Sequence, residues 1–405
     1  MSFAGMFNTG NFTTDLAKKS FAGMITRLMP NGTAPLFGLT GMLPTETAVQ
    51  VEHGFFTKTM VFPEMQLNGA IADATTNVFT VDSTTNIMPG QLFRVDSTGE
   101  NILVNQVLSS TQVQVIRGLG SVAAAAVADD VKLFQVGNAF EEGSMRPSAL
   151  NITPVRVTNL TQIFRNTWAI TDSARATQVI AGETNIAESK QDCAAFHAAD
   201  IEKGLFFGQK SQGTRNGKPF RTMDGLISIV SNLTYYPPSY AAVNTTTMGA
   251  TTNYTQLEAA LDPVFNQATD PKVANERILF TGGTGKKVLN NIGRLNGTYM
   301  MVDGATTWGL QFSTFKTARG TFRVIEHPLF NTNTSWAKMA VAVDLSTFSV
   351  AYLGDRKTRS EEFGAQDGDD GMDATGGSLT TELTTVIKNP PANAIIYNLT
   401  AAATG

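Results

Sequence analysis

The sequence has very little cysteine and histidine. Its 405 residues include one cysteine, Cys193, and three histidines. A single cysteine forms no disulfide within the chain, which excludes an extracellular disulfide framework and suits assembly in a reducing cytoplasm. Cys193 and His197 stand one helical turn apart, but no second ligand pair completes a zinc site. We therefore interpret both as part of a buried helical stripe, neither metal ligands nor a Cys–His nucleophile.

Charge and long apolar runs are also scarce. Charged residues make up 16% of the chain, and the formal net charge is -4. Nucleic-acid-binding proteins usually carry a basic excess, so no general electrostatic attraction to nucleic acid is expected. No apolar run is long enough to cross a bilayer, and residues 1–29 lack the pattern of a signal peptide. The 42% of hydrophobic residues predicts a globular protein of two or three domains.

A glycine-rich segment at 281–287, TGGTGKK, follows an apolar strand pattern and opens a helical one. That context suits a phosphate-binding loop. The spacing does not, because Phe280 stands where the first glycine is needed and Lys287 replaces the magnesium-binding hydroxyl. The pattern favours a tight strand-to-helix turn. A nucleotide-dependent enzyme that uses Gly282 is the alternative.

An acidic segment runs from Asp367 to Asp373. A helix-loop-helix calcium site needs glycine at its sixth position and glutamate at its twelfth, where this chain has Met372 and Ser378. We therefore interpret the segment as a solvated loop. No catalytic residue, cofactor or metal is expected anywhere in the chain.

The order of patterns predicts an α+β protein built of several parts. Residues 1–48 are apolar but interrupted by Gly, Pro and Asn, a pattern that fits either a loosely attached terminus or an arm that lies on a neighbouring subunit. Strand-like limbs at 49–62 and 150–164 enclose residues 70–137, whose short strands are typical of a small all-β barrel or sandwich. The β segment is thus expected to be an insertion into a long hairpin.

A long helix is predicted from Ser173 to Gly208. Asp172 or Ser173 can cap its start, and Gly208 is a plausible stop. Apolar residues recur every seven positions, as from Val179 to Cys193, which keeps one stripe on one face. The helix would be about 50 Å long.

Residues 225–344 alternate strand and helix patterns and predict a mixed α/β domain. Residues 345–405 contain strand patterns at 379–387 and 394–399 but too few apolar residues for a separate core. We expect them to pack back against the long helix.

This order of parts resembles the Hong Kong 97-like capsid fold of tailed bacteriophages. Local sequence is similar to the family of major capsid proteins related to that of phage SU10. The segments that carry the similarity are 89–95 (PGQLFRV), 161–165 (TQIFR), 200–208 (DIEKGLFFG), 221–227 (RTMDGLI) and 379–399.

The resemblance implies a major capsid protein, which is a structural shell subunit and no enzyme. It implies pentamers and hexamers that close into an icosahedral head around double-stranded DNA. The parts it implies are an N-terminal arm (1–48), an extended loop (49–69 and 138–165), an inserted β domain (70–137), a peripheral domain (166–224 and 345–405) with a spine helix (173–208), and an axial domain (225–344).

The resemblance also implies partners. These are other copies of the chain, a portal protein, a decoration protein, and packaged DNA without sequence-specific contact; no membrane is expected. Some relatives carry an N-terminal scaffolding segment, and because only residues 1–48 precede the first limb here, we expect a separate scaffolding protein instead. Assembly is expected in the host bacterial cytoplasm. The residues expected to contact neighbouring subunits are Phe3, Phe7, Phe21, Phe55, Phe56, Lys58, Arg156 and Arg165.

Another virion or surface protein, such as a decoration, fibre or S-layer-like subunit, is a competing interpretation. The β insertion and the threonine-rich composition agree with it. The long helix argues against it, because fibres and decorations are rarely built around one.

Overall fold

A computed structural model describes residues 34–41, 43–58, 63–147, 153–177, 185–236, 240, 242–266, 276–295, 313–363 and 373–400. The chain divides into two compact units. One comprises residues 57–155, and the other comprises residues 1–56 and 156–405. Within the described ranges no helix has the length and apolar character needed to span a membrane.

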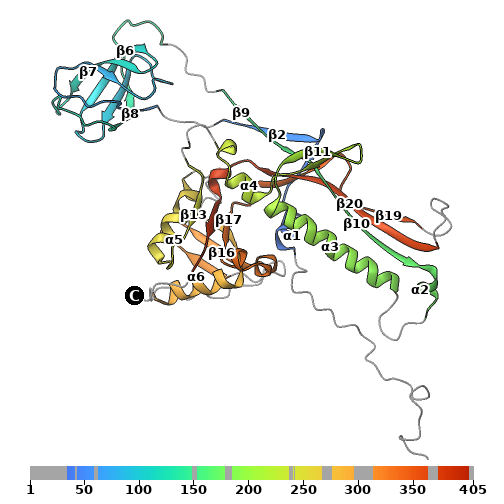
Figure 1. The fold of residues 1–405 in the computed structure, drawn as a ribbon. Helices are drawn as coiled ribbons and strands as arrows, with labels where there is room; N and C mark the ends of the chain where they lie inside the picture. Colours follow the sequence, from blue (N-terminus) through green and yellow to red (C-terminus); the bar gives the residue numbers. More distant parts are fainter. Residues whose placement is uncertain are drawn as a thin grey trace, which may run out of the picture. The chain divides into compact units, whose positions relative to one another are not determined.

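The unit at 57–155 is a small six-stranded β-barrel (Figure 1). Its strands pair in the order β3-β8-β5-β6-β7-β4, and a bridge between Leu67 and Val81 closes the ring. Closure leaves no free edge for pairing with another chain. The strands are β3 (Glu64–Gln66), β4 (Val78–Thr80), β5 (Gln91–Val95), β6 (Asn101–Ser109), β7 (Gln112–Leu119) and β8 (Lys132–Asn138).

Buried and exposed side chains alternate along the strands, and the buried ones fill the interior of the barrel. Phe93 and Val95 of β5 are buried, whereas Arg94 between them is exposed. The five strands expected from short apolar runs are all present. The unit is nevertheless wider than the expected range 70–137, because β3 lies before it and carries only one buried apolar residue, Met65.

We expect Phe79→Ala to destabilise this barrel selectively. The ring is fully buried, and the Arg117 guanidinium lies 5.2 Å from its centre. Truncation of a buried Phe costs about 3–5 kcal/mol. Hydrogen exchange read by mass spectrometry should rise across 57–155 while the core of the other unit stays protected. Leu108→Ala, at a residue that is 46% exposed, is the control. Equal exchange in the two variants would contradict the assignment of Phe79 to the core.

The other unit contains a five-stranded sheet in the order β1-β18-β20-β10, with β19 also paired to β20. The helix α3 (Asn185–Phe207) lies along β10 and β20 (Figure 1). The C-terminal strand β20 therefore returns to the long helix, as the sequence predicts. The strands are β1 (Thr45–Ala48), β10 (Gln162–Thr171), β18 (Phe348–Leu353), β19 (Arg359–Phe363) and β20 (Ala374–Ile387).

The long helix is shorter than predicted. A separate helix, α2 (Asp172–Ala176), comes first, and the described part of α3 has 23 residues, or roughly 35 Å. The cap of α2 is Thr171, whose hydroxyl accepts the Ala174 N–H at 3.3 Å, not Asp172 or Ser173. Val179, from which the expected stripe starts, lies outside the described residues.

A six-stranded mixed sheet, in the order β13-β21-β17-β14-β16-β15, forms the α/β part. Strand β21 belongs to this sheet, where it pairs with β17 and β13, although residues 345–405 were expected to pack back against the long helix. The strands are β13 (Thr245–Thr247), β14 (Glu276–Thr281), β15 (Ser313–Lys316), β16 (Thr321–Glu326), β17 (Ala340–Val343) and β21 (Ala394–Tyr397).

Short helices accompany this sheet. Asn253 caps α5 in a capping box with Gln256, which sets the first residue of that helix. The helices are α4 (Leu226–Val230), α5 (Tyr254–Leu261), α6 (Gly283–Leu295) and α7 (Thr334–Ala337), with 3-10 turns at 233–235, 262–265, 328–332 and 390–392.

A two-stranded ribbon of β2 (Glu52–Thr57) and β9 (Val155–Leu160) corresponds to the predicted limbs. The second limb ends earlier than expected, since β10 pairs with β20 and not with the first limb. Gly54 permits the close approach of the two strands: a Cβ there would lie 2.3 Å from the Val157 carbonyl oxygen.

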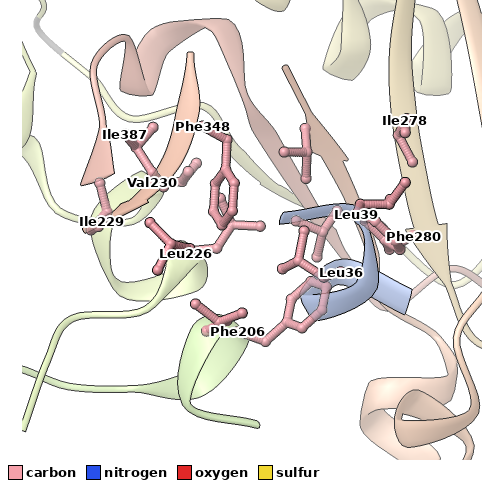
Figure 2. Packing of buried hydrophobic residues seen from close by; sticks show 14 of the residues in the cluster. Leu36, Leu39, Phe206, Leu226, Ile229, Val230, Ile278, Phe280, Phe348 and Ile387 are labelled. Atoms are coloured by element: carbon pink, nitrogen blue, oxygen red, sulfur yellow. The ribbon is translucent and has the colours of Figure 1, made fainter. Parts of the chain in front are cut away.

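One apolar cluster joins the arm helix α1 (Pro35–Thr40) to the rest of its unit. Figure 2 shows Leu36 beside Phe206 at the end of α3, and Leu39 beside Phe280 of β14. Both leucines are buried. The end of the arm thus belongs to the core, at the place where helix and sheet meet.

Candidate assembly site

The polar centre of this junction is Glu202, which is 1% exposed on α3. Its two carboxylate oxygens accept the backbone N–H groups of Leu36 at 2.9 Å and Phe37 at 2.7 Å. Backbone N–H groups in the first turn of a helix have no partner within the helix. The cap residue of α1, Ala34, makes no side-chain hydrogen bond, so Glu202 is their acceptor. The carboxylate therefore caps the arm helix from another element, where the helix dipole favours negative charge.

His327 completes the cluster from the α/β part. Its Nδ1 accepts the Leu329 N–H at 3.1 Å, so the ring proton must lie on Nε2. That proton is donated to Glu202 at 2.6 Å, and the ring is fully buried. The imidazole stacks on Phe330 with centres 5.0 Å apart. One carboxylate thus ties together the arm, the long helix and the α/β part.

A second buried polar group joins α3 to the five-stranded sheet. His197 Nδ1 lies 2.8 Å from Asn166 Oδ1, and Nε2 lies 2.7 Å from the Thr381 hydroxyl. The predicted stripe is confirmed here, because Cys193 and His197 are both buried. Burial lowers the pKa of His197, while the nearby Asp200 carboxylate opposes that shift.

We expect stability to fall as acid protonates His197 in the unfolded chain. Because the pKa is lower in the folded state, the stability is complete above the unfolded value near 6.5 and is lost as the pH falls below it. The slope contributed by one group is at most about 1.4 kcal/mol per pH unit. Chemical denaturation between pH 7.5 and 5 should show a steeper loss for the wild type than for His197→Gln. Parallel curves would contradict this role of His197.

The third centre is Glu382 of β20, which is 1% exposed. It accepts the Thr161 hydroxyl at 2.8 Å and pairs with Arg356 at 3.0 Å and Arg221 at 3.6 Å. Thr161 lies where the ribbon strand β9 passes into β10. The pairing therefore stabilises the base of the ribbon against the sheet.

The fourth centre is Asp224, between β12 and α4. It accepts the Lys210 N–H at 2.8 Å and the Ser228 hydroxyl at 2.6 Å, and Tyr235 donates to its other oxygen. Burial and this carboxylate raise the pKa of Tyr235. Asn159 bonds to the Asp224 backbone, so the ribbon is attached here as well.

Of the residues predicted for assembly, Phe56 and Arg156 lie in the ribbon and Lys58 directly follows β2, all three with exposed side chains. Phe56 is 72% exposed, Lys58 is exposed, and Arg156 lies 3.6 Å from Glu52. Phe55 packs instead against the core of its own unit. Arg165 donates to the Thr380 hydroxyl at 3.1 Å on the sheet surface.

Phe3, Phe7 and Phe21 lie outside the described residues. Sequence reasoning missed Glu202, Glu382, Asp224 and His327. The signal available for Glu202 was an acidic side chain next to Ile201 and close to Leu205 on the apolar face of the helix.

The glycine-rich segment at 281–287 is a close-packed turn. A Cβ on Gly285 would lie 2.2 Å from the Thr281 hydroxyl oxygen, and one on Gly282 would lie 2.6 Å from the Ala337 Cα. The Gly283 N–H is already bonded to Asn331 at 2.7 Å. These contacts explain the glycines by packing. The acidic loop lies mostly outside the described residues, and the described side chains form no cluster that could hold a metal.

The fold defines a class of protein. The chain is similar to a solved structure described as the capsid of the native GTA particle, with a TM-score of 0.51 and 10% identity over 99% of this chain and 100% of that one. A chain from Mycobacterium phage Adephagia covers 97% of each at 8% identity and a TM-score of 0.46. The predicted α+β architecture, a Hong Kong 97-like capsid fold, is confirmed.

Residues 8–400 match the model of the SU10 major capsid protein family, and the chain belongs to that family. It is also 38% identical to the major capsid protein of Pseudomonas phage PaMx41, over 99% of this chain and 97% of that protein. The chain is thus a phage major capsid protein, a virion component that assembles from many copies and not an enzyme. The competing interpretations as a fibre protein or a nucleotide-dependent enzyme were wrong.

Proposed function

We propose that the chain forms pentamers and hexamers that close into an icosahedral head around double-stranded DNA. The observation that carries this is the ribbon of β2 and β9, which in the described residues pairs with no third strand. A two-stranded hairpin is marginally stable in water. Phe56 at 72% and Val155 at 38% exposure give this ribbon apolar surface that a neighbouring subunit would cover.

In this proposal the parts have the roles that the family resemblance gives them. The ribbon is the extended loop, α3 the spine helix and the five-stranded sheet the peripheral domain. The six-stranded sheet, with β21, is the axial domain. The arm before Pro35 would lie on a neighbouring subunit and be held at its base by Glu202.

The inserted barrel would stand on the outer surface of the head. Residues 57–155 hold five Lys and Arg residues against nine Asp and Glu, which equals the whole formal net charge of the chain, -4. An acidic unit is repelled by DNA phosphates and is best placed away from them. A portal protein, a separate scaffolding protein and a decoration protein complete the proposed assembly, which takes place in the host cytoplasm.

Phe56→Asp tests the proposal. We expect this variant to fold with an unchanged melting temperature, because the ring is mostly exposed, and to form shells in less than a tenth of the wild-type yield. Sedimentation and negative-stain microscopy of cells that express the full set of head genes would measure this. Leu108→Asp, at a 46% exposed site on the barrel, is the matched control. Normal shells from the Phe56 variant would contradict the role of the ribbon.

A further inference from the structure

An exposed, cationic hairpin follows the long helix. Strands β11 (Ser211–Arg215) and β12 (Lys218–Thr222) are joined by Asn216 and Gly217, with φ of 52° and 72°. Positive φ at both positions is the geometry of a tight two-residue hairpin turn. Residues 203–223 contain five Lys and Arg and no acidic residue. The end of the helix and the hairpin together thus carry five positive charges and no acidic residue of their own.

Three of these five cations have partners in their own chain. Lys203 pairs with Asp200 at 3.0 Å, Lys210 donates to the Thr158 carbonyl, and Arg221 lies near Glu382. Arg215 and Lys218 have no ion pair or side-chain hydrogen bond with the described part of the chain. They face each other directly in the hairpin register, and like charges in that position destabilise a sheet. An anion between them would remove this repulsion.

An aromatic ring stands on the same face. Phe220 is two residues from Lys218 and is paired with Gly213, so the period of a strand puts it beside the two cations. The ring lies over Gly213, where a Cβ would be 2.7 Å from its edge, and is 44% exposed. Arg215, Lys218 and Phe220 thus form one surface, which we call the hairpin face.

The barrel carries a surface of matching chemistry. Glu141 and Glu142 are adjacent and exposed, and neither carboxylate has a partner among the described residues. Phe140 beside them is 44% exposed and lies over Gly90, where a Cβ would be 2.3 Å from the ring. Phe140, Glu141 and Glu142 form the acidic barrel face.

In each of the other two adjacent acidic pairs of the described residues, at 129–130 and 361–362, at least one carboxylate already has a partner. Asp129 accepts the Gly69 N–H at 2.6 Å, and Glu362 pairs with Lys190 at 2.6 Å. Only the acidic barrel face, in the part of the chain that the structure describes, combines two unpartnered adjacent carboxylates with an exposed ring. The acidic barrel face is therefore the surface that best matches the hairpin face in charge and in apolar character.

We propose that the hairpin face of one subunit docks on the acidic barrel face of a second copy of this chain. The inference rests on the proposed assembly into shells. Since the two faces differ, the contact is head-to-tail, a geometry that generates rings when the rotation closes. Each exposed ion pair contributes little alone, so the contact acts through repetition around the ring and through burial of the two phenylalanines.

Charge reversal in the full chain tests the contact. The variant Arg215→Glu with Lys218→Glu, and the variant Glu141→Lys with Glu142→Lys, should each lower the yield of shells at least tenfold. All four substitutions in one chain should restore the yield. A one-to-one mixture of the two double variants should form six-membered rings, in which the two variants can alternate and each offers the other an opposite charge.

The control is Lys287→Glu with Lys316→Glu, which makes the same charge change at exposed positions of the α/β part. It should assemble as the wild type does. Normal shells from the hairpin variant, or no rescue by the fourfold variant, would overturn the contact. Normal shells with less packaged DNA would overturn it in favour of a phosphate contact. A wild-type chain that never assembles would overturn the contact together with the proposed function.

Discussion

Gly225→Ala should strongly destabilise the larger unit. A Cβ at this position would lie 2.7 Å from the Gly204 carbonyl oxygen, 2.7 Å from the Gly208 nitrogen and 2.9 Å from the Leu205 carbonyl oxygen. All three are backbone atoms at the end of α3, so no side chain can move aside. Overpacking of this kind costs at least about 3 kcal/mol, or roughly 6–12 °C in melting temperature for a domain of this size.

The measurement is the melting temperature and soluble yield of the full chain. Gly249→Ala is the matched control, because no atom lies within 4 Å of the position its Cβ would take. We expect that control to stay within about 0.5 kcal/mol of the wild type. A Gly225 variant that melts with the control would show that the helix end is not packed as described.

Glu202→Ala should release the arm helix from the core. The change leaves the N–H groups of Leu36 and Phe37 buried without acceptors and removes the partner of His327. Loss of one member of a buried polar pair costs about 3–5 kcal/mol. Limited proteolysis should then cut the chain near residues 34–41, at least tenfold faster than in the wild type.

Glu361→Ala is the control for this variant, since that glutamate is exposed on β19. His327→Ala should give a smaller effect, because it leaves both arm N–H groups bonded to Glu202. If the Glu202 and Glu361 variants are cut at the same rate, Glu202 does not anchor the arm.

The sequence predicted the strands and turns that depend only on the pattern of neighbouring residues. The barrel strands alternate buried and exposed residues, as Phe93 and Arg94 do, and β17 is a continuous apolar run. Glycine and asparagine mark the turns between them. Such patterns depend on the period of one strand, so a single sequence contains them.

The missed features depend on contacts between distant segments. Glu202 and Leu36 are 166 positions apart, and Thr161 and Glu382 are 221 apart. The burial of these carboxylates could not be predicted, because the groups that donate hydrogen bonds to them come from other elements. The same reason explains β21, whose apolar run fits either sheet until β13 and β17 are in place.

At the end of α3 the sequence predicted the position of the glycine but not the main reason for it. Gly208 was predicted as a helix stop, and α3 does end at Phe207. The stronger reason for the glycine is the Met223 carbonyl oxygen, 2.6 Å from where its Cβ would be. That neighbour arrives only after the hairpin of β11 and β12 has folded back.

The most direct test of the account is electron microscopy of the purified wild-type protein, with light scattering on the same sample. The account predicts pentamers, hexamers or closed icosahedral shells, with the barrel of residues 57–155 on the outer surface. A protein that stays a monomer under all assembly conditions, or a shell map with the barrel facing the interior, would contradict it.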